Sequence, residues 1–278
     1  MAKFETREIN EAKDYEELSQ PKLVHDNLRE SSIQSWQVVS KDRAEAEDCN
    51  CTCQMLRSAC KWSLGLATNQ TECSIMNSYM ELINKAENYI YMENQFFISS
   101  NASRKVKNPI VKCLIDKLKS KIKNHELFKV IICIPLIPGH TGDVQDKSGN
   151  LIRLFLSYEN KTIGVGEKSI IETVKRSIKL YKPPRHEVSD YVQVFGFRTH
   201  DVMPDGEPRT EIIYIHSKLL LVDDKVALIG SANLNDRSML GTRDTELAMV
   251  VNDNHMVKGK LSYEEGTTIM GVNYHFCL

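Results

Sequence analysis

Short β-branched segments alternate with amphipathic helical segments along most of this chain of 278 residues. Ile75, Tyr79 and Ile83 recur at helical spacing, and the aromatic and β-branched run 89–98 follows them. A second helical stripe at 110–122, opened by Pro109, precedes a short apolar run at 129–134. This alternation predicts an α/β sandwich with a mixed central sheet.

The remaining elements are expected to complete the same sheet. Segments 151–158 and 169–180 have helical character, and a first strand is expected near 53–58. Later β-rich segments lie close together, which is typical of hairpins and therefore of antiparallel pairs. We expect these strands at 191–198, 212–215, 219–222, 226–229 and 246–251.

The chain divides by composition into three parts. Residues 1–48 are polar and charge-rich, so we expect a linker or lead-in there. Residues 49–252 carry the alternating elements and are expected to form one folded lobe, and 253–278 a short C-terminal tail. A hydrophobic content of 41% is enough for a core in the middle part.

The charge and hydropathy of the chain indicate where it acts. Its net charge of −1 gives no global bias toward nucleic acid or a membrane, and we expect no nucleic-acid partner. No apolar run reaches the roughly 18 residues of a spanning helix, and the charged N-terminus has no apolar signal region. We therefore expect a cytoplasmic protein that can be peripheral on membranes.

Two further patterns leave alternatives open. Cys49, Cys51 and Cys53 could bind a soft metal, but their spacing is not that of a structural zinc site, so we expect free thiols and no metal. The helix predicted at 110–122 could present a basic face to anionic lipid head groups, although a solvated face is the favoured interpretation. Its lysines are Lys112, Lys117, Lys119, Lys121 and Lys123.

A polar cluster interrupts the apolar strands near the C-terminal end. His216 and Lys218 are two residues apart on a predicted strand, so their side chains share one face. Gly230 and Ser231 end the next strand, and Asn233 follows them. We expect these segments to meet at one edge of the sheet, a common place for ligand sites in α/β folds.

These residue types suit phosphodiester chemistry. Lysine, serine and asparagine donors neutralise a phosphodiester, and an imidazole that titrates near neutrality can attack phosphorus or carry a proton. Such a histidine needs an orienting carboxylate, for which Glu246 is the candidate. Asp223 is expected to be structural, bonding the backbone of a turn or an arginine.

The pattern His216-x-Lys218-x4-Asp223, followed by Gly-Ser-x-Asn, resembles the signature of the phospholipase D superfamily, called HKD. Longer segments at 90–97, 213–218 and 230–238 resemble those of eukaryotic phospholipase D. The resemblance covers residues 50–252 and implies one lobe of a bilobal phospholipase D fold, resembling the C-terminal catalytic lobe.

The resemblance implies an activity and a set of roles. The activity is hydrolysis of phosphatidylcholine-type phospholipids to phosphatidic acid and free head group, with transphosphatidylation, through a phosphohistidine and without a metal or cofactor. His216 is implied as the acid and base, with Lys218, Asp223 and Glu246 as further catalytic residues. Lys218, Ser231 and Asn233 are implied to bind the phosphate.

The other seven histidines of the chain have no lysine two residues later, so a second HKD motif is missing. We therefore expect a fragment that needs a second HKD half, either a homodimer mate or an N-terminal half on another chain. A phospholipid membrane surface is the other expected partner. The alternative is a catalytically inactive fragment that binds phospholipid or a partner enzyme lobe.

Overall fold

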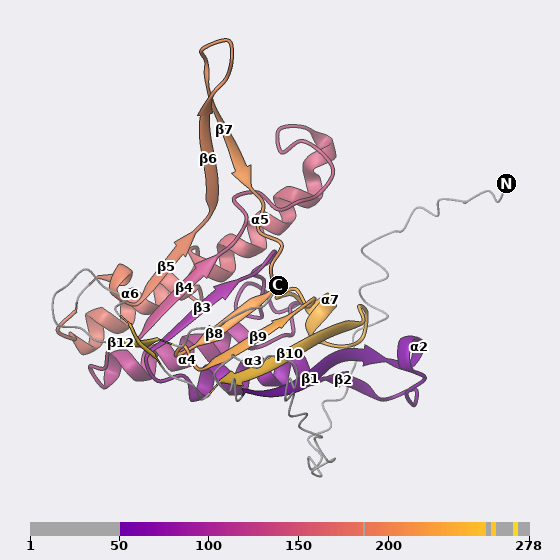
Figure 1. The fold of residues 1–278 in the computed structure, drawn as a ribbon, viewed down its shortest axis with the longest axis vertical. Helices are drawn as coiled ribbons and strands as arrows, with labels where there is room; N and C mark the ends of the chain where they lie inside the picture. The colour runs from indigo at the N-terminus through magenta and orange to yellow at the C-terminus, as the bar shows by residue number, and fades with distance from the viewer. Residues whose placement is uncertain (1–50, 186, 254–256, 260–268, 272–278) are drawn as a thin grey trace, which may run out of the picture. The chain divides into compact units, whose positions relative to one another are not determined.

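An eight-stranded sheet forms the centre of the computed structural model, which describes residues 51–185, 187–253, 257–259 and 269–271 (Figure 1). The strand order is β2-β1-β10-β9-β8-β3-β4-β5. The strands are β1 (Cys51–Cys60), β2 (Thr71–Cys73), β3 (Tyr89–Glu93), β4 (Lys129–Cys133), β5 (Val192–Phe195), β8 (Leu219–Val222), β9 (Val226–Gly230) and β10 (Glu246–Asp253). The predicted lead-in 1–48, and all of the predicted tail except 253, 257–259 and 269–271, lie outside the described residues.

The sheet is mixed, as the alternation of elements predicts. β3, β4 and β5 run parallel, because helical crossovers connect them, and the other neighbours are antiparallel. The helices are α2 (Lys61–Leu64), α3 (Ser74–Lys85), α4 (Ile110–Lys123), α5 (Asn150–Ile163), α6 (Ile170–Tyr181) and α7 (Asp236–Met239), with short 3₁₀ turns at Lys147–Gly149 and Val188–Asp190.

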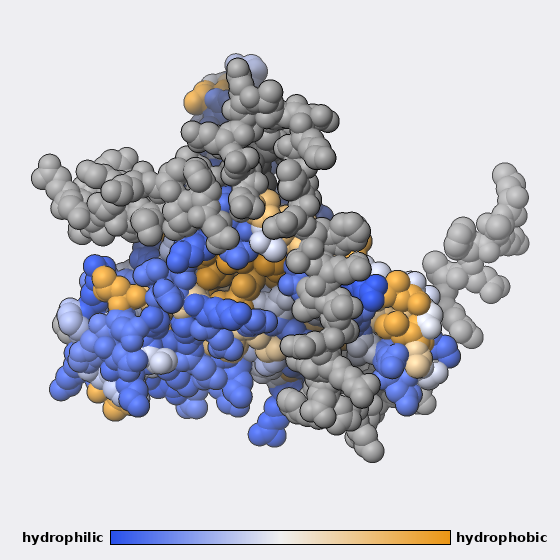
Figure 2. Space-filling view, turned by 60° about the horizontal axis from the view of Figure 1, so that its bottom comes forward, coloured by the Kyte–Doolittle hydropathy of each residue, from blue (hydrophilic) through white to orange (hydrophobic). Residues whose placement is uncertain are grey.

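The two faces of the sheet differ in burial. α4 packs against both α3 and α6, and this helical layer covers one face, where Ile90, Met92 and Leu220 are fully buried. Their strand neighbours Tyr91 and Leu221 point to the opposite face and are only partly buried. Figure 2 shows apolar residues at the surface near the middle of that view. We call the side of the sheet that carries Tyr91 and Leu221 the open face.

Strands β1 and β10 carry the most exposed apolar side chains of the open face. Met55 on β1 is 58% exposed and Leu247 on β10 is 57% exposed. Met249, which pairs with Met55 in the register of the two strands, shares this side of the sheet. Apolar side chains in such a position indicate a surface that another element or chain can cover.

A separate hairpin follows β5 and was not expected from the sequence. β6 (Phe197–Val202) pairs with β7 (Pro208–Ile213), and the hairpin projects away from the main sheet (Figure 1). The strand predicted at 191–198 therefore ends at Phe195 in the main sheet. Gly196 marks the break, because the loop after β4 approaches so closely that a Cβ there would lie 2.2 Å from Leu136 Cδ2. β11 (Val257–Gly259) and β12 (Ile269–Gly271) form another two-stranded pair.

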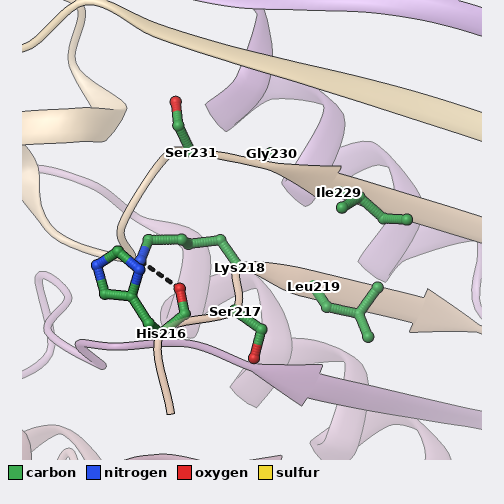
Figure 3. Close-up of a pocket in the computed structure, with 7 residues that line it drawn as sticks. All are labelled: His216, Ser217, Lys218, Leu219, Ile229, Gly230 and Ser231. Carbon is green, nitrogen blue, oxygen red and sulfur yellow. Dashed lines mark hydrogen bonds between the residues drawn. The ribbon is translucent and has the colours of Figure 1, made fainter. Parts of the chain in front are cut away.

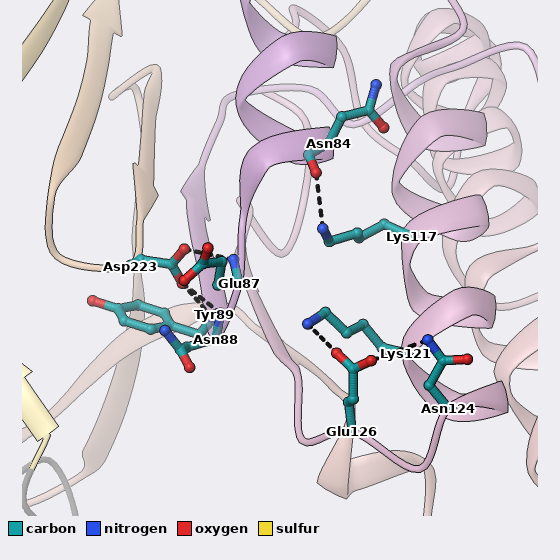
Figure 4. Close-up of polar contacts among 9 residues, drawn as sticks. All are labelled: Asn84, Glu87, Asn88, Tyr89, Lys117, Lys121, Asn124, Glu126 and Asp223. Carbon is teal, nitrogen blue, oxygen red and sulfur yellow. Dashed lines mark hydrogen bonds and ion pairs between the residues drawn. The ribbon is translucent and has the colours of Figure 1, made fainter.

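Two lysines of the basic helix α4 are engaged within the fold (Figure 4). Lys117 Nζ donates to the backbone oxygen of Asn84 at 2.8 Å, and Lys121 forms an ion pair with Glu126. Burial is the main cause that lowers the pKa of Lys117. Lys112, Lys119 and Lys123 are exposed, so only part of the predicted basic face is open to a ligand.

Within the described residues, none of the helices is both long and apolar enough to cross a lipid bilayer. The six described cysteines are all free thiols, and Cys49 lies outside the described part. His, Cys, Asp and Glu side chains do not gather in threes as a metal site anywhere in that part.

Candidate active site

Of the predicted site residues, His216, Lys218 and Ser231 meet at one edge of the sheet and line a pocket, and Glu246 bonds Ser231. Asn233 follows in the same loop without lining the pocket, and Asp223 lies elsewhere. His216 and Lys218 were expected on a strand, but they lie in the non-strand segment just before β8. Gly230 ends the neighbouring strand β9, and Ser231 follows it. Together with Ser217, Leu219 and Ile229 they line a pocket of about 440 Å³ (Figure 3). The expectation that these two segments come together is met by the antiparallel pairing of β8 and β9.

Lys218 is the most buried cation of this site, with only 6% of its surface exposed. Its Nζ donates to the carbonyl oxygen of His216 and, at 3.2 Å, to Oε1 of Gln95. Burial lowers the pKa of Lys218, and the negative charge of Glu246 opposes this shift. A buried ammonium with one proton to spare is a good ligand for an anion.

Glu246 is held by two serines. Its carboxylate accepts hydrogen bonds from Ser238 Oγ at 2.6 Å and from Ser231 Oγ at 2.5 Å. Among the described residues no hydrogen bond joins Glu246 to His216, so the predicted orienting role remains a prediction. The Ser231 hydroxyl would have to turn away from Glu246 to donate to a phosphate.

Asn233 follows Ser231 in the same loop. Its Oδ1 is buried and has no hydrogen-bond partner within the described part of the chain. The loop itself leaves β9 at Gly230, where a Cβ would lie 2.4 Å from the Cβ of Ala248. Only glycine allows this close packing of β9 against β10.

Asp223 lies at the opposite end of β8 from Lys218 (Figure 4). Its carboxylate accepts hydrogen bonds from the backbone N–H groups of Glu87, Asn88 and Tyr89 at 2.6–2.8 Å. Asp223 and Asp224 both have positive φ, 52° and 53°, in the tight turn between β8 and β9. Asp223 therefore bonds backbone groups at the start of β3, as expected for a structural residue, and does not join the pocket.

Sequence reasoning overlooked the end of β3 as part of the site. The strand predicted to reach residue 98 stops at Glu93, because the Asn94 side chain turns inward. Asn94 Oδ1 accepts from the N–H groups of Phe96 at 3.2 Å and Leu234 at 3.0 Å. This ties the 94–97 segment to the loop that carries Ser231. The polar triplet Glu-Asn-Gln at the end of an apolar strand was the signal available in the sequence.

Glu93 and Gln95 contact the histidine segment from the same side. Ser217 donates to Glu93, and the Gln95 amide lies between Lys218 and the Tyr214 hydroxyl. The Tyr214 ring also stacks with the His216 imidazole, with 6.3 Å between the ring centroids. The segments around Gln95 and His216, more than a hundred residues apart in sequence, thus form a single polar unit.

A family model described as phospholipase D matches residues 3–276. The chain belongs to the phospholipase D family. It is 37% identical over 227 residues to phospholipase D2 of Bos taurus, which covers 81% of this chain and 23% of that protein. It is 38% identical over 222 residues to phospholipase D1 of Saccharomyces cerevisiae, covering 79% of this chain and 13% of the relative.

The chain thus spans about a fifth of the length of its first curated phospholipase D relatives. Among solved structures it is similar to Nuc of Salmonella typhimurium, a phospholipase D family member, at 16% identity with a TM-score of 0.37, covering 73% of this chain and 84% of that one. It is also similar to phosphatidylserine synthase of Haemophilus influenzae, at 14% identity with a TM-score of 0.38, covering 80% of this chain and 38% of that one.

Proposed function

We propose that this chain is the HKD catalytic lobe of a phospholipase D. It would hydrolyse phosphatidylcholine-type phospholipids to phosphatidic acid and head group, and transfer the phosphatidyl group to short alcohols. The observation that carries the proposal is the buried Lys218 ammonium beside His216 in a pocket at the sheet edge. The family membership supports the same reaction class.

The proposed mechanism proceeds through a phosphohistidine. A histidine of a second HKD half attacks phosphorus and forms an N–P bond, while His216 donates a proton to the departing head-group oxygen. His216 then takes a proton from water, whose oxygen attacks phosphorus; the N–P bond breaks, and phosphatidic acid and the free histidine of the second half are released. Lys218, Ser231 and Asn233 would bind the phosphate oxygens, and Glu246 would orient His216.

We propose that a second HKD half docks on the open face. The open face presents partly buried apolar side chains such as Tyr91, Leu221 and Met249, which a facing sheet could cover. Sheets that pack face to face bury apolar surface of this kind. We propose a homodimer mate or an N-terminal half on another chain as the occupant, and a cytoplasmic protein that meets the membrane peripherally.

Transphosphatidylation tests this function directly. The purified chain is incubated with phosphatidylcholine vesicles and 1-butanol, alone and with an added N-terminal HKD half. Phosphatidylbutanol should form with the wild-type chain and should fall at least a hundredfold in His216→Asn and Lys218→Met, because a positioned histidine contributes about 10²–10⁴-fold. His125→Asn is the matched control, since His125 lies next to the end of α4 and bonds Tyr181.

A binding role without turnover is the second candidate, favoured by the single HKD motif of the chain. The chain would then hold phospholipid or a partner lobe through the same pocket. Co-sedimentation with vesicles that disappears in Lys218→Met, in the absence of any phosphatidylbutanol with or without the added half, would support this role. Product that disappears in the His216→Asn variant would exclude it.

A further inference from the structure

The hydroxyl oxygen of Tyr214 is the acceptor in two hydrogen bonds at the mouth of the site. The backbone N–H of Gly139 donates to it at 3.1 Å, and Gln95 Nε2 donates at 2.8 Å. The orientation of the Gln95 amide follows from chemistry, because its other end faces the Lys218 ammonium, which has no lone pair to offer. Both lone pairs of the Tyr214 oxygen are therefore engaged, and its proton must point elsewhere.

That proton meets no acceptor within the described ranges of the chain. Tyr214 is 41% exposed, so a ligand that approaches from solvent can reach its side chain. The ring stacks with His216 at an interplanar angle of 27°, and the hydroxyl bonds Gln95, whose other amide end contacts Lys218, so Tyr214 belongs to the surroundings of the site. Hydrogen bonds received by a hydroxyl polarise it and make it a better donor.

The Lys218 ammonium also has one proton that is not engaged, so it is the second free donor beside that of Tyr214. Its Nζ donates to Gln95 Oε1 and to the His216 carbonyl oxygen, and an ammonium has three protons. One side-chain amide, that of Gln95, thus separates two free donors on Lys218 and Tyr214. A phosphodiester has two charged non-bridging oxygens, so it can accept one hydrogen bond from each donor.

The loop after β4 is shaped to receive Tyr214. A Cβ at Gly139 would lie 2.4 Å from the Tyr214 oxygen, so a glycine is needed for the backbone to approach this closely. The hydroxyl is therefore fixed from two sides, by Gly139 and by Gln95. A donor held in this way loses little conformational entropy when a ligand binds.

We propose that Tyr214 is a substrate-binding residue whose hydroxyl donates to a phosphate oxygen of the diester that Lys218 binds, and that Gln95 is a positioning residue that sets the spacing between the two donors. This inference rests on the proposed function, because it adds a ligand to the same phosphate site. The occupant is a phosphodiester, whether part of a lipid or free.

A ³¹P NMR titration of the full chain with dimethyl phosphate tests this inference. Tyr214→Phe should raise the Kd about tenfold, the size expected for a lost hydrogen bond to a charged group. Gln95→Leu should raise the Kd severalfold. The Kd of the double variant should rise by less than the product of the two single-variant increases, because Gln95 acts through Tyr214. Tyr181→Phe on α6 is the matched control and should bind as the wild type does.

Gly139→Ala gives a second route, since it displaces the hydroxyl without removing it and should also weaken binding. If folded Tyr214→Phe binds dimethyl phosphate with wild-type affinity while Lys218→Met does not bind it, the role of Tyr214 is overturned and the phosphate site at Lys218 stands. If the Kd of the double variant rises by the full product of the Tyr214→Phe and Gln95→Leu increases, the positioning role of Gln95 is overturned. If the wild-type chain and Lys218→Met both fail to bind, the phosphate site itself is refuted, and the role of Tyr214 with it.

Discussion

Asp223 shows how a residue of a catalytic signature can act at a distance from the chemistry. It accepts three backbone hydrogen bonds at the start of β3, while Lys218 lies at the other end of β8. Four strand residues separate the two, which corresponds to roughly 15 Å. The motif therefore joins the proposed phosphate ligand Lys218 and the structural Asp223 at the two ends of β8.

Asp223→Asn should lower the free energy of unfolding by about 2 kcal/mol, because a charged acceptor for three N–H groups is replaced by a neutral amide. Urea unfolding measures this, with the exposed Asp116→Asn as control. Binding of dimethyl phosphate by the folded fraction should stay as in the wild type. A folded Asp223→Asn protein that fails to bind would show a direct role in the pocket.

Glu159 on α5 is a buried carboxyl group whose strongest contact is one N–H donor, that of Phe97 at 3.4 Å. Burial raises its pKa from 4.5 to about 7. The raised pKa means that the folded state favours the protonated form. Glu159 therefore makes its full contribution to the free energy of unfolding below about pH 4.5, the pKa of this group in the unfolded chain. That contribution is lost as the pH rises through about 7, the pKa in the folded chain.

The wild-type chain should accordingly be less stable at pH 8 than at pH 4.5 by about 3 kcal/mol from this group alone. Glu159→Gln should remove that pH-dependent loss, because the amide stays neutral at all pH values. Urea unfolding at several pH values between 4.5 and 8 measures the difference, with the exposed Glu167→Gln as control. If the free energy of unfolding changes with pH in the same way in the wild type and in Glu159→Gln, Glu159 is not the group responsible for the loss of stability.

At the scale of elements, the end of β3 organises the site. Asn94 holds the N–H groups of Phe96 and Leu234, and Ile98 N–H donates to the Leu234 carbonyl oxygen at 2.9 Å. These hydrogen bonds therefore join the 94–98 segment to the loop that follows β9. We expect Ser231 and Asn233 to shift when these hydrogen bonds are broken.

Asn94→Ala should leave two N–H groups without their acceptor and cost about 2–6 kcal/mol of stability, since each unsatisfied buried group costs roughly 1–3 kcal/mol. Amide hydrogen exchange at Leu234 should accelerate more than exchange in α3. Asn77→Ala, at an exposed position of α3, is the matched control. Unchanged protection of Leu234 would mean that the loop does not depend on Asn94.

Much of this arrangement follows from the sequence at the level of elements. Helical periodicity predicted α3, α4 and α6, and β-branched runs predicted β4, β8, β9 and β10, because burial on one face fixes both patterns. The end of β3 and the β6–β7 hairpin were not predicted. Both depend on contacts with distant loops, at Leu234 and Leu136, which a local pattern does not contain.

The site is predictable to a similar extent. The spacing of His216 and Lys218 placed them together, and the pairing of β8 with β9 brought Ser231 to the same edge. Gln95 and Tyr214 could not be assigned from spacing, since their role arises from a hydrogen-bond unit that joins three separate loops.

For the whole molecule, we propose that the open face is the surface through which the chain associates with a second HKD half. Met55 and Leu247 are both more than half exposed and lie on adjacent strands, so charges there should leave the fold intact. The double variant Met55→Glu and Leu247→Glu should abolish association with a second HKD half by placing charges in the contact. Analytical ultracentrifugation detects the change.

Trp62→Glu is the control for that experiment, because Trp62 is 69% exposed but lies on α2, outside the sheet. It should associate as the wild type does. If the double variant and the wild type sediment alike as assemblies, the contact lies on another surface.

The pairing of β1 with β10 has a consequence for the synthesis of the chain. Their register extends from Cys51 opposite Asp253 to Ser58 opposite Glu246, so the inner neighbour of β1 is made almost two hundred residues later. At about 5–20 residues per second, a ribosome needs roughly 10–40 s to supply it. Until then the nascent β1 has only the three-residue β2 beside it, and an unpaired strand edge readily pairs with other chains. The time before β10 emerges is therefore when the edge of β1 is most open to pairing with other chains.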